Sequence, residues 1–246
     1  MNIKDSVILI TGSAERVGKA TALLLAREGA RVVIQYRTKE AKAQETAAEI
    51  AATGAADPLV LQGDISRIED WRAMKTQILE SYGRIDVLVN NAAVFYKTPF
   101  FDIREAQWDH FMNVNLKGVF LGCQVLGEVM VAQQRGKIIN IADVAAAQVW
   151  PGFIPYCVSK AGVVALTEGL AKALGPYVTV NAVAPGTVLP EDEGHDSAAE
   201  QKLIERTPLK RIGTPEDVAR TVAFLIAGSD FITGTTIKVD GGRSLS

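Results

Sequence analysis

The sequence alternates short runs of apolar, often β-branched residues with longer stretches of helical periodicity, and this alternation restricts the fold more than any other feature. Most of the short runs are continuously apolar, which is typical of strands covered on both faces. Such an order predicts a mainly parallel, doubly wound α/β sheet with right-handed crossovers. The predicted strands are Val7–Thr11, Val32–Gln35, Leu59–Gln62, Ile85–Asn90, Lys137–Ala142, Val178–Ala184 and Thr236–Val239.

Helices are expected in the gaps between these strands. Pro215, followed by Glu216 and Asp217, marks one helix start, and Thr214 is available as its N-cap. The chain contains no evident linker, low-complexity segment or short tandem repeat. We therefore predict a single Rossmann-type domain over residues 1–246, with a seven-stranded sheet and helices at 17–28, 39–52, 68–82, 105–134, 157–174 and 215–227.

The charge balance argues against several classes of partner. The chain has 26 basic and 28 acidic residues, so we expect neither nucleic acid nor a membrane surface as a partner. Two cysteines, Cys123 and Cys157, provide neither a disulfide framework nor a zinc site, and we expect no metal. The N-terminus shows no signal-peptide pattern, so we expect a cytoplasmic protein that acts on a small molecule.

The first predicted strand runs into the segment TGSAERVGKATALLLAREGA. Gly12 and Gly18 frame a turn that opens a helix, where backbone N–H groups and the positive helix end suit a pyrophosphate. A strict G-x-G-x-x-G pattern is absent, because Arg16 stands where a glycine is often found. We predict that a dinucleotide binds at this turn, with Gly12, Ser13, Arg16, Val17 and Gly18 as its contacts.

The second predicted strand ends without the acidic residue that usually binds a free ribose 2′-hydroxyl. Gln35 is followed instead by Tyr36, Arg37, Thr38 and Lys39. Two cations and a hydroxyl suit the 2′-phosphate of NADP, and cations sit poorly at the positive end of a helix unless an anion is present. We therefore predict NADPH rather than NADH as the cofactor; the alternative is a solvated first helical turn.

The third and fourth predicted strands end in further candidate cofactor contacts. Asp64 and Ile65 are expected to hold the adenine amine and ring face, although Asp64 can equally cap the next helix. The segment NNAA then supplies Asn91, Ala92 and Ala93, of which the alanines let the backbone approach a ribose or nicotinamide.

The glycine turn, NNAA, Asn115, YCVSK and NAVAPG (181–186), in this order, resemble the short-chain dehydrogenase/reductase family over essentially the whole chain. The resemblance implies that Tyr156 is the proton donor and that Lys160 binds the nicotinamide ribose and lowers the pKa of the tyrosine. The i, i+4 spacing of this pair supports both roles. The resemblance also implies a homotetramer, a water held by Asn115 in a proton relay, and a nicotinamide bordered by Pro185, Gly186 and Val188.

Asp143 departs from the pattern of most of this family, where a serine thirteen positions before the tyrosine hydrogen-bonds the substrate carbonyl. An ionised carboxylate at that position would repel the oxyanion that forms during ketone reduction. Reduction of a C=N bond needs a proton on nitrogen instead, and a carboxyl group can hold and aim that proton. The alternative is that Asp143 only caps a turn at the end of a strand.

Pteridine reductases, one branch of the family, resemble this chain at three positions: the aspartate, the arginine in the glycine turn, and an aromatic residue shortly after NNA, here Phe95. Ala93 differs from the serine that is common there. We predict NADPH-dependent reduction of a pterin or dihydrofolate-like C=N bond, with Phe95, Asp143 and Tyr156 at the substrate. The alternatives are a carbonyl reductase, such as a 3-oxoacyl-[acyl-carrier-protein] reductase, and a cofactor-binding protein without catalytic activity.

Two further segments carry expectations. Residues 188–205 are largely acidic and polar, and we expect them to form a lid over the substrate. The helix that carries Tyr156 is apolar around most of its circumference, so we expect its outer face to be buried against a second subunit. Trp150 and Phe153 lie in a loop that can wall the pocket.

Overall fold

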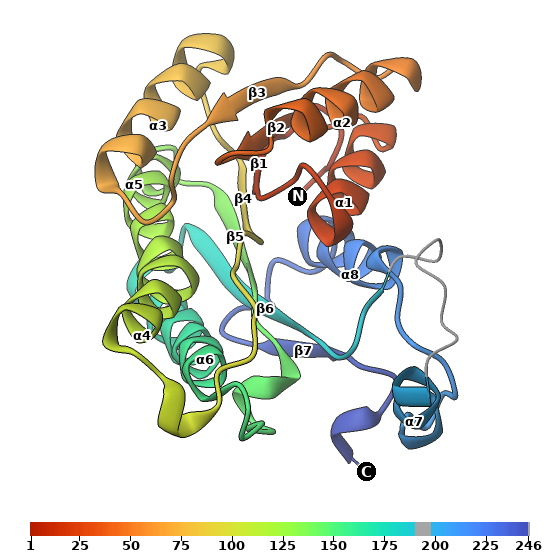
Figure 1. The fold of residues 1–246 in the computed structure, drawn as a ribbon. Coiled ribbons are helices and arrows are strands. Elements are labelled where there is room, and N and C mark those ends of the chain that lie inside the picture. Colours follow the sequence, from red (N-terminus) through yellow and green to blue (C-terminus); the bar gives the residue numbers. More distant parts are fainter. Residues whose placement is uncertain (190–197, 246) are drawn as a thin grey trace.

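The computed structural model describes residues 1–189 and 198–245 (Figure 1). Within this part of the chain, seven strands form one sheet in the order β3-β2-β1-β4-β5-β6-β7, and every neighbouring pair is parallel. The predicted doubly wound α/β fold is therefore confirmed, and the sheet is parallel throughout. The strands are β1 Val7–Thr11, β2 Arg31–Tyr36, β3 Leu59–Gln62, β4 Val87–Asn90, β5 Gly136–Ile141, β6 Val178–Pro185 and β7 Thr236–Val239.

Helices cover both faces of the sheet, as the continuously apolar strands require. On one face, α1 (Arg16–Arg27), α2 (Glu40–Ala52) and α8 (Pro215–Ala227) share an apolar core with the sheet. On the other face, α3 (Ile68–Tyr82), α5 (Gly118–Ala132) and α6 (Ile154–Leu174) build a second core. Figure 1 shows the two helix groups on opposite sides of the strands.

The predicted helix 105–134 is an interrupted helical run. It consists of α4 (Glu105–Phe111), a π-helical segment (Met112–Lys117) and α5. By length and composition the run Glu105–Ala132 could cross a membrane, but 61% of its most apolar window is buried inside the protein. The run therefore belongs to the core of the domain.

The segment expected to form a lid is described only in part. Residues 190–197 of the predicted lid lie outside the described residues, whereas Ala198–Arg206 form helix α7. This helix is not among the predicted ones, because its residues are mostly polar and lack a long apolar stripe. A second correction concerns α6, which begins at Ile154 rather than at residue 157, with a proline in its first turn.

Candidate active site

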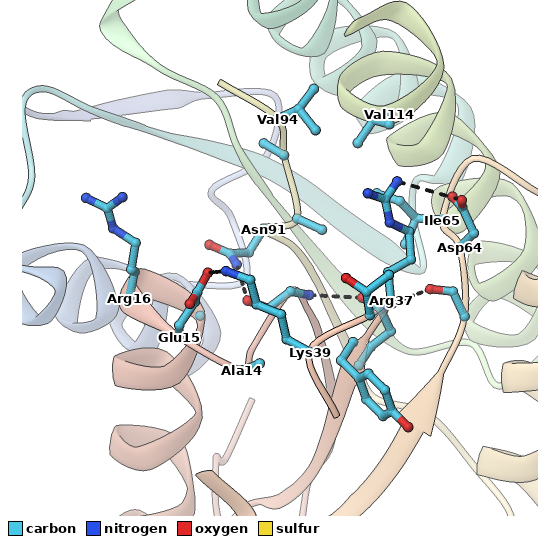
Figure 2. Close-up of a pocket in the computed structure, with 18 of the residues that line it drawn as sticks. Ala14, Glu15, Arg16, Arg37, Lys39, Asp64, Ile65, Asn91, Val94 and Val114 are labelled. Atoms are coloured by element: carbon cyan, nitrogen blue, oxygen red, sulfur yellow. Dashed lines mark hydrogen bonds and ion pairs between the residues drawn. The ribbon is translucent and has the colours of Figure 1, made fainter. Parts of the chain in front are cut away.

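A pocket of about 440 Å³ opens beyond the carboxyl ends of β1, β2, β3 and β4 (Figure 2). This is the position at which ligands bind in doubly wound sheets. Most of the predicted cofactor contacts line it, namely Gly12, Arg16, Val17, Gly18, Tyr36, Arg37, Thr38, Lys39, Asp64, Ile65, Asn91, Ala92, Ala93 and Tyr156. The lining also includes residues that the sequence analysis did not assign: Ala14, Glu15, Gln35, Gly63, Val94 and Val114.

The turn between β1 and α1 packs so closely against the end of β4 that two of its positions need glycine. Gly12 has φ +64°, and a Cβ added there would lie 2.9 Å from the Cα of Ala92. A Cβ on Gly18 would lie 2.6 Å from the Nδ2 of Asn91. Arg16 has φ +53°, in the left-handed region that glycine favours, which explains why a glycine is common at this place. These features leave a cradle of backbone that fits a pyrophosphate.

Ser13 is the member of the predicted turn contacts that lies outside the pocket lining. Its buried Oγ donates to the carbonyl oxygen of Ile10 at 2.8 Å and accepts from the N–H of Gln35 at 3.2 Å. The side chain therefore joins β1 to β2, and the contact of Ser13 with a cofactor stays a prediction. A polar residue in a glycine turn gives no sequence signal that separates these two roles.

Gln35, in strand β2, links two of the loops that surround the pocket. Its Oε1 accepts from the backbone N–H of Gly12 at 2.9 Å, and its Nε2 donates to the carbonyl oxygen of Gly63 at 2.7 Å. The side chain is almost fully buried, so these bonds are shielded from competition with water. Gln35 thus fixes the glycine turn relative to the loop after β3.

The cations after β2 have partners within the protein. The Nζ atoms of Lys39 and Lys42 both bond to the carboxylate of Glu15, with Lys42 at 2.9 Å from Oε2. The guanidinium of Arg37 lies 3.9 Å from Oδ2 of Asp64 (Figure 2). The anion expected beside these cations at the start of the helix is therefore present within the protein, because Glu15 supplies it.

Asp64 does not cap the following helix. Its Oδ1 accepts from the N–H of Ser66 at 2.9 Å and from the hydroxyl of Ser66 at 2.7 Å, whereas Arg67 occupies the N-cap of α3. Asp64 and Ile65 both line the pocket, next to Arg37. Asp64 therefore lies where a cofactor contact is possible, and its contact with the adenine stays a prediction.

Tyr156, which lines the pocket, bonds directly to Asp143. The Oη of Tyr156 donates to Oδ2 of Asp143 at 2.6 Å, and Oδ1 of Asp143 accepts from the backbone N–H of Ala145 at 2.8 Å. Asp143 is thus both the turn-capping acid and a direct partner of the tyrosine. Tyr156 also lines the pocket, whereas Asp143 lies outside its lining.

Lys160 follows Tyr156 by one turn of α6, and both side chains are buried. The Nζ of Lys160 donates to the carbonyl oxygen of Ile141 at 2.7 Å and lies 5.8 Å from the centre of the Tyr156 ring. Burial lowers the pKa of Lys160 to about 8, an effect that the nearby charge of Asp143 partly opposes. Lys160 lies outside the pocket lining, so its predicted bond to the nicotinamide ribose stays a prediction.

The pKa of Tyr156 does not follow the expectation drawn from the lysine. Burial, together with the charge and hydrogen bond of Asp143, raises the pKa of the phenol well above 10. Burial also raises the pKa of Asp143, although the bonds from Ala145 and Tyr156 and the charges of Lys160 and Arg243 oppose this shift. The two shifts together favour the protonated forms of both groups, which is the state a proton donor needs.

Asn115 lies in the π-helical segment between α4 and α5, and its side-chain amide hydrogen-bonds to other residues of the protein. Its Oδ1 accepts from the N–H of Val94 at 2.8 Å, while its Nδ2 donates to the carbonyl oxygen of Val94 at 3.0 Å and to the hydroxyl of Ser159 at 3.3 Å. The direct role of these bonds is to fix the loop after β4 against α6. The water predicted at Asn115 stays a prediction.

Three aromatic rings, those of Phe95, Trp150 and Phe153, gather beside the Asp143–Tyr156 pair. The ring of Phe95 stacks on Phe153 at 4.8 Å with an angle of 2° between the planes, and it meets the Tyr156 ring edge-on at 4.8 Å. Trp150 packs edge-on against both phenylalanines. Phe95 nevertheless remains 57% exposed, so part of the ring is open to a ligand. The three rings thus form an aromatic wall next to the tyrosine, and its contact with a substrate stays a prediction.

The predicted border of the nicotinamide lies outside the pocket lining. Pro185 ends β6, and the N–H of Gly186 donates to the carbonyl oxygen of Val239 at 3.0 Å. A Cβ on Gly186 would lie 2.8 Å from the Cβ of Asp240, so the glycine is needed for this close approach. Val188 pairs with Gly213. The structure thus gives each of these residues a packing role, and their contact with a cofactor stays a prediction.

Comparison with known proteins supports the arrangement described above. The family profile described as "Enoyl-(Acyl carrier protein) reductase" matches residues 12–244. A 3-oxoacyl-[acyl-carrier-protein] reductase of Thermotoga maritima is 39% identical over 98% of this chain and 99% of its own length. A reductase of the same description from Synechocystis is 38% identical, with 96% of both chains covered.

Solved structures agree with these matches. A levodione reductase superposes with a TM-score of 0.92 at 32% identity, with 99% of each chain covered. A gluconate 5-dehydrogenase from Burkholderia cenocepacia, determined in complex with NADP and tartrate, superposes with a TM-score of 0.90 at 34% identity over 100% of this chain and 98% of its own.

Proposed function

The chain belongs to the short-chain dehydrogenase/reductase family, and we propose that it is an NADPH-dependent reductase acting on a C=N bond in a planar, pterin- or dihydrofolate-like ring. Membership of this family makes the protein an oxidoreductase that uses NAD(P). The choice of NADPH is supported by the segment that follows β2. It places two cationic side chains, those of Arg37 and Lys39, in the pocket lining. The glycine cradle at the start of α1 fits the pyrophosphate of such a cofactor.

The observation that carries the substrate proposal is the 2.6 Å bond between Tyr156 and Asp143. A bound NADPH supplies the hydride. The protein's own residues then manage the proton: the Tyr156 hydroxyl lies at the pocket and donates to the substrate atom, and Asp143 stands behind it as the next proton source. Because burial raises the pKa of Asp143, its carboxyl group holds this proton more readily than an exposed aspartate.

The aromatic wall supports a planar substrate. Phe95 lies edge-on to Tyr156 and keeps more than half of its surface exposed, while Phe153 and Trp150 support it from behind. A flat heterocycle packed on this ring would be held beside the Tyr156 hydroxyl. A flexible acyl chain gains no comparable orientation from a ring face.

A second candidate is a carbonyl reductase acting on 3-oxoacyl thioesters, and the sequence comparisons favour it. The curated relatives reported above are named 3-oxoacyl-[acyl-carrier-protein] reductases, with 38–39% identity over nearly the whole chain. In this reading, Asp143 in its neutral form donates a hydrogen bond to the substrate carbonyl. Its raised pKa is compatible with that role as well.

A side-by-side assay separates the two candidates. NADPH oxidation by the purified protein is measured with 7,8-dihydrobiopterin, dihydrofolate and an acetoacetyl thioester under identical conditions. The main proposal expects the highest kcat/KM with one of the ring substrates. A higher kcat/KM with the thioester would support the second candidate, and a protein that binds NADPH but turns over neither class would have lost its chemistry.

We also propose that the active form is a homotetramer in the cytoplasm. On the outer faces of the helices, Val158 of α6 is 42% exposed and Phe120 of α5 is 41% exposed in the single chain. Such apolar positions on two long helices are typical of a subunit interface. Sedimentation equilibrium at micromolar concentration tests the assembly, and a stable monomer would contradict it.

A further inference from the structure

We infer that Glu15 is a specificity-determining residue, which competes with the 2′-phosphate of NADPH for Lys39 and Lys42 and so limits the preference for NADPH over NADH. This inference rests on the cofactor proposed above, and it concerns a residue that was not assigned from the sequence. According to this inference, the ion pairs of Glu15 with Lys39 and Lys42 contribute to the choice between NADPH and NADH.

Three side chains form the cluster that carries the inference. Glu15 stands at the N-cap of α1, and the two lysines stand at the start of α2. Each ammonium bonds a different carboxylate oxygen, Lys39 with Oε1 and Lys42 with Oε2. Figure 2 shows the Lys39 side chain reaching across the pocket to Glu15. Both lysines of the cluster are therefore already engaged with Glu15.

Glu15 lies in the wall of the main pocket. Together with Ala14 and Arg16, it also lines a second pocket of about 440 Å³. Its side chain keeps 33% of its surface exposed, and the two lysines keep 54% and 56%. The cluster is accessible to a ligand rather than sealed in the core.

Electrostatics gives the direction of the effect. The hydrogen bonds from Lys39 and Lys42 lower the pKa of Glu15, so the carboxylate is charged at neutral pH. A 2′-phosphate that approaches Lys39 must share or displace these bonds and also meets the negative charge of Glu15. A neutral 2′-hydroxyl meets no such repulsion and can donate to the carboxylate. Glu15 therefore weakens the binding of NADPH more than the binding of NADH.

The test uses Glu15→Gln, which keeps the size of the side chain and removes its charge. The matched control is Glu45→Gln, because Glu45 is an exposed residue of α2 that lines only the second pocket. Isothermal titration calorimetry measures the affinities of both variants and the unaltered protein for 2′,5′-ADP and 5′-AMP, which differ only in the 2′-phosphate. The same proteins are titrated with NADPH and NADH.

We expect Glu15→Gln to bind 2′,5′-ADP about fivefold more tightly, which is the scale of two exposed ion pairs, while its affinity for 5′-AMP changes less than about twofold. Glu45→Gln should leave the ratio of the two affinities unchanged. An unchanged or weaker affinity of Glu15→Gln for 2′,5′-ADP would overturn the inference. If the unaltered protein itself prefers 5′-AMP, the proposed cofactor is wrong; that result is distinct from failure of the Glu15 inference alone.

Discussion

The hydroxyl of Tyr156 donates a 2.6 Å hydrogen bond to Oδ2 of Asp143, and both side chains are largely shielded from water. The second carboxylate oxygen is fixed by the N–H of Ala145, so the carboxyl group is oriented as well as placed. Burial raises the pKa of Asp143 and of Tyr156. A serine at position 143 could offer one hydroxyl to a substrate, whereas the carboxyl group can also store a proton for transfer.

The pH dependence of the reaction should report the carboxyl group. Since the pKa of Asp143 is raised, the group stays protonated further towards neutral pH, and kcat/KM for a dihydropterin should fall as the pH rises through that pKa. In Asp143→Ser this decline should disappear. A pH profile recorded from about pH 5 to about pH 9 checks this; the same decline in both proteins would assign it to another group.

The cations beyond β2 should distinguish the two nicotinamide cofactors. We expect Arg37→Ala combined with Lys39→Ala to weaken NADPH binding about tenfold or more and to change NADH binding by less than about twofold, since only NADPH carries the 2′-phosphate. Fluorescence titration of the reduced cofactors measures both constants. Equal losses for the two cofactors would contradict the assignment.

Phe95 should contribute to the substrate rather than to the fold. More than half of the ring is exposed, so Phe95→Ala should raise KM for a dihydropterin by about fivefold, at the scale of one aromatic contact, with little change in Tm. The comparison variant is Phe231→Ala, because Phe231 is 98% exposed and lies just before β7. Steady-state kinetics measures KM, and thermal unfolding measures Tm, for both variants. An unaltered KM in Phe95→Ala would leave the ring as packing for Phe153.

Lys160 should destabilise the free protein at neutral pH. Its pKa is lowered from 10.5 to about 8, so the folded protein releases this proton before the unfolded chain does. The cost of burying the charge is therefore present below about pH 8 and disappears as the pH rises towards 10.5. Lys160→Met should raise the free energy of unfolding more at pH 7 than at pH 10.5, by about 3 kcal/mol.

Denaturant unfolding at the two pH values measures this difference. Lys172→Met, on an exposed turn of the same helix, should show almost none of it. A gain in Lys160→Met that is independent of pH would show that the buried ammonium is compensated by its bond to Ile141.

Much of the fold could be predicted from the sequence because its strands are buried on both faces. Continuous apolar runs such as Val7–Thr11 have no other stable place than the centre of a covered sheet, and their observed bounds match the predicted ones. Helix α7 could not be predicted in the same way, since a short polar helix leaves no apolar period in the sequence. The π-helical segment carries Asn115, whose bonds to Val94 join distant parts of the chain and leave no local pattern in the sequence.

In the candidate site, too, features set by local sequence could be predicted, and features set by contacts between distant segments could not. Positions that depend on local backbone geometry, such as Gly12 and Gly18, could be predicted from their spacing around a turn. Pairings between side chains of different loops could not. Nothing in the sequence indicated that Glu15 bonds both lysines, or that Ser13 turns inward to β2.

The central claim is that Asp143 adapts the site to a ring nitrogen rather than to a carbonyl oxygen. Its most direct test is the ratio of kcat/KM for 7,8-dihydrobiopterin to kcat/KM for an acetoacetyl thioester, measured with NADPH in the unaltered protein and in Asp143→Ser. We expect the ratio to fall at least about tenfold in the variant, because dihydropterin turnover drops while thioester turnover holds or rises. A ratio that is the same in both proteins would contradict the claim.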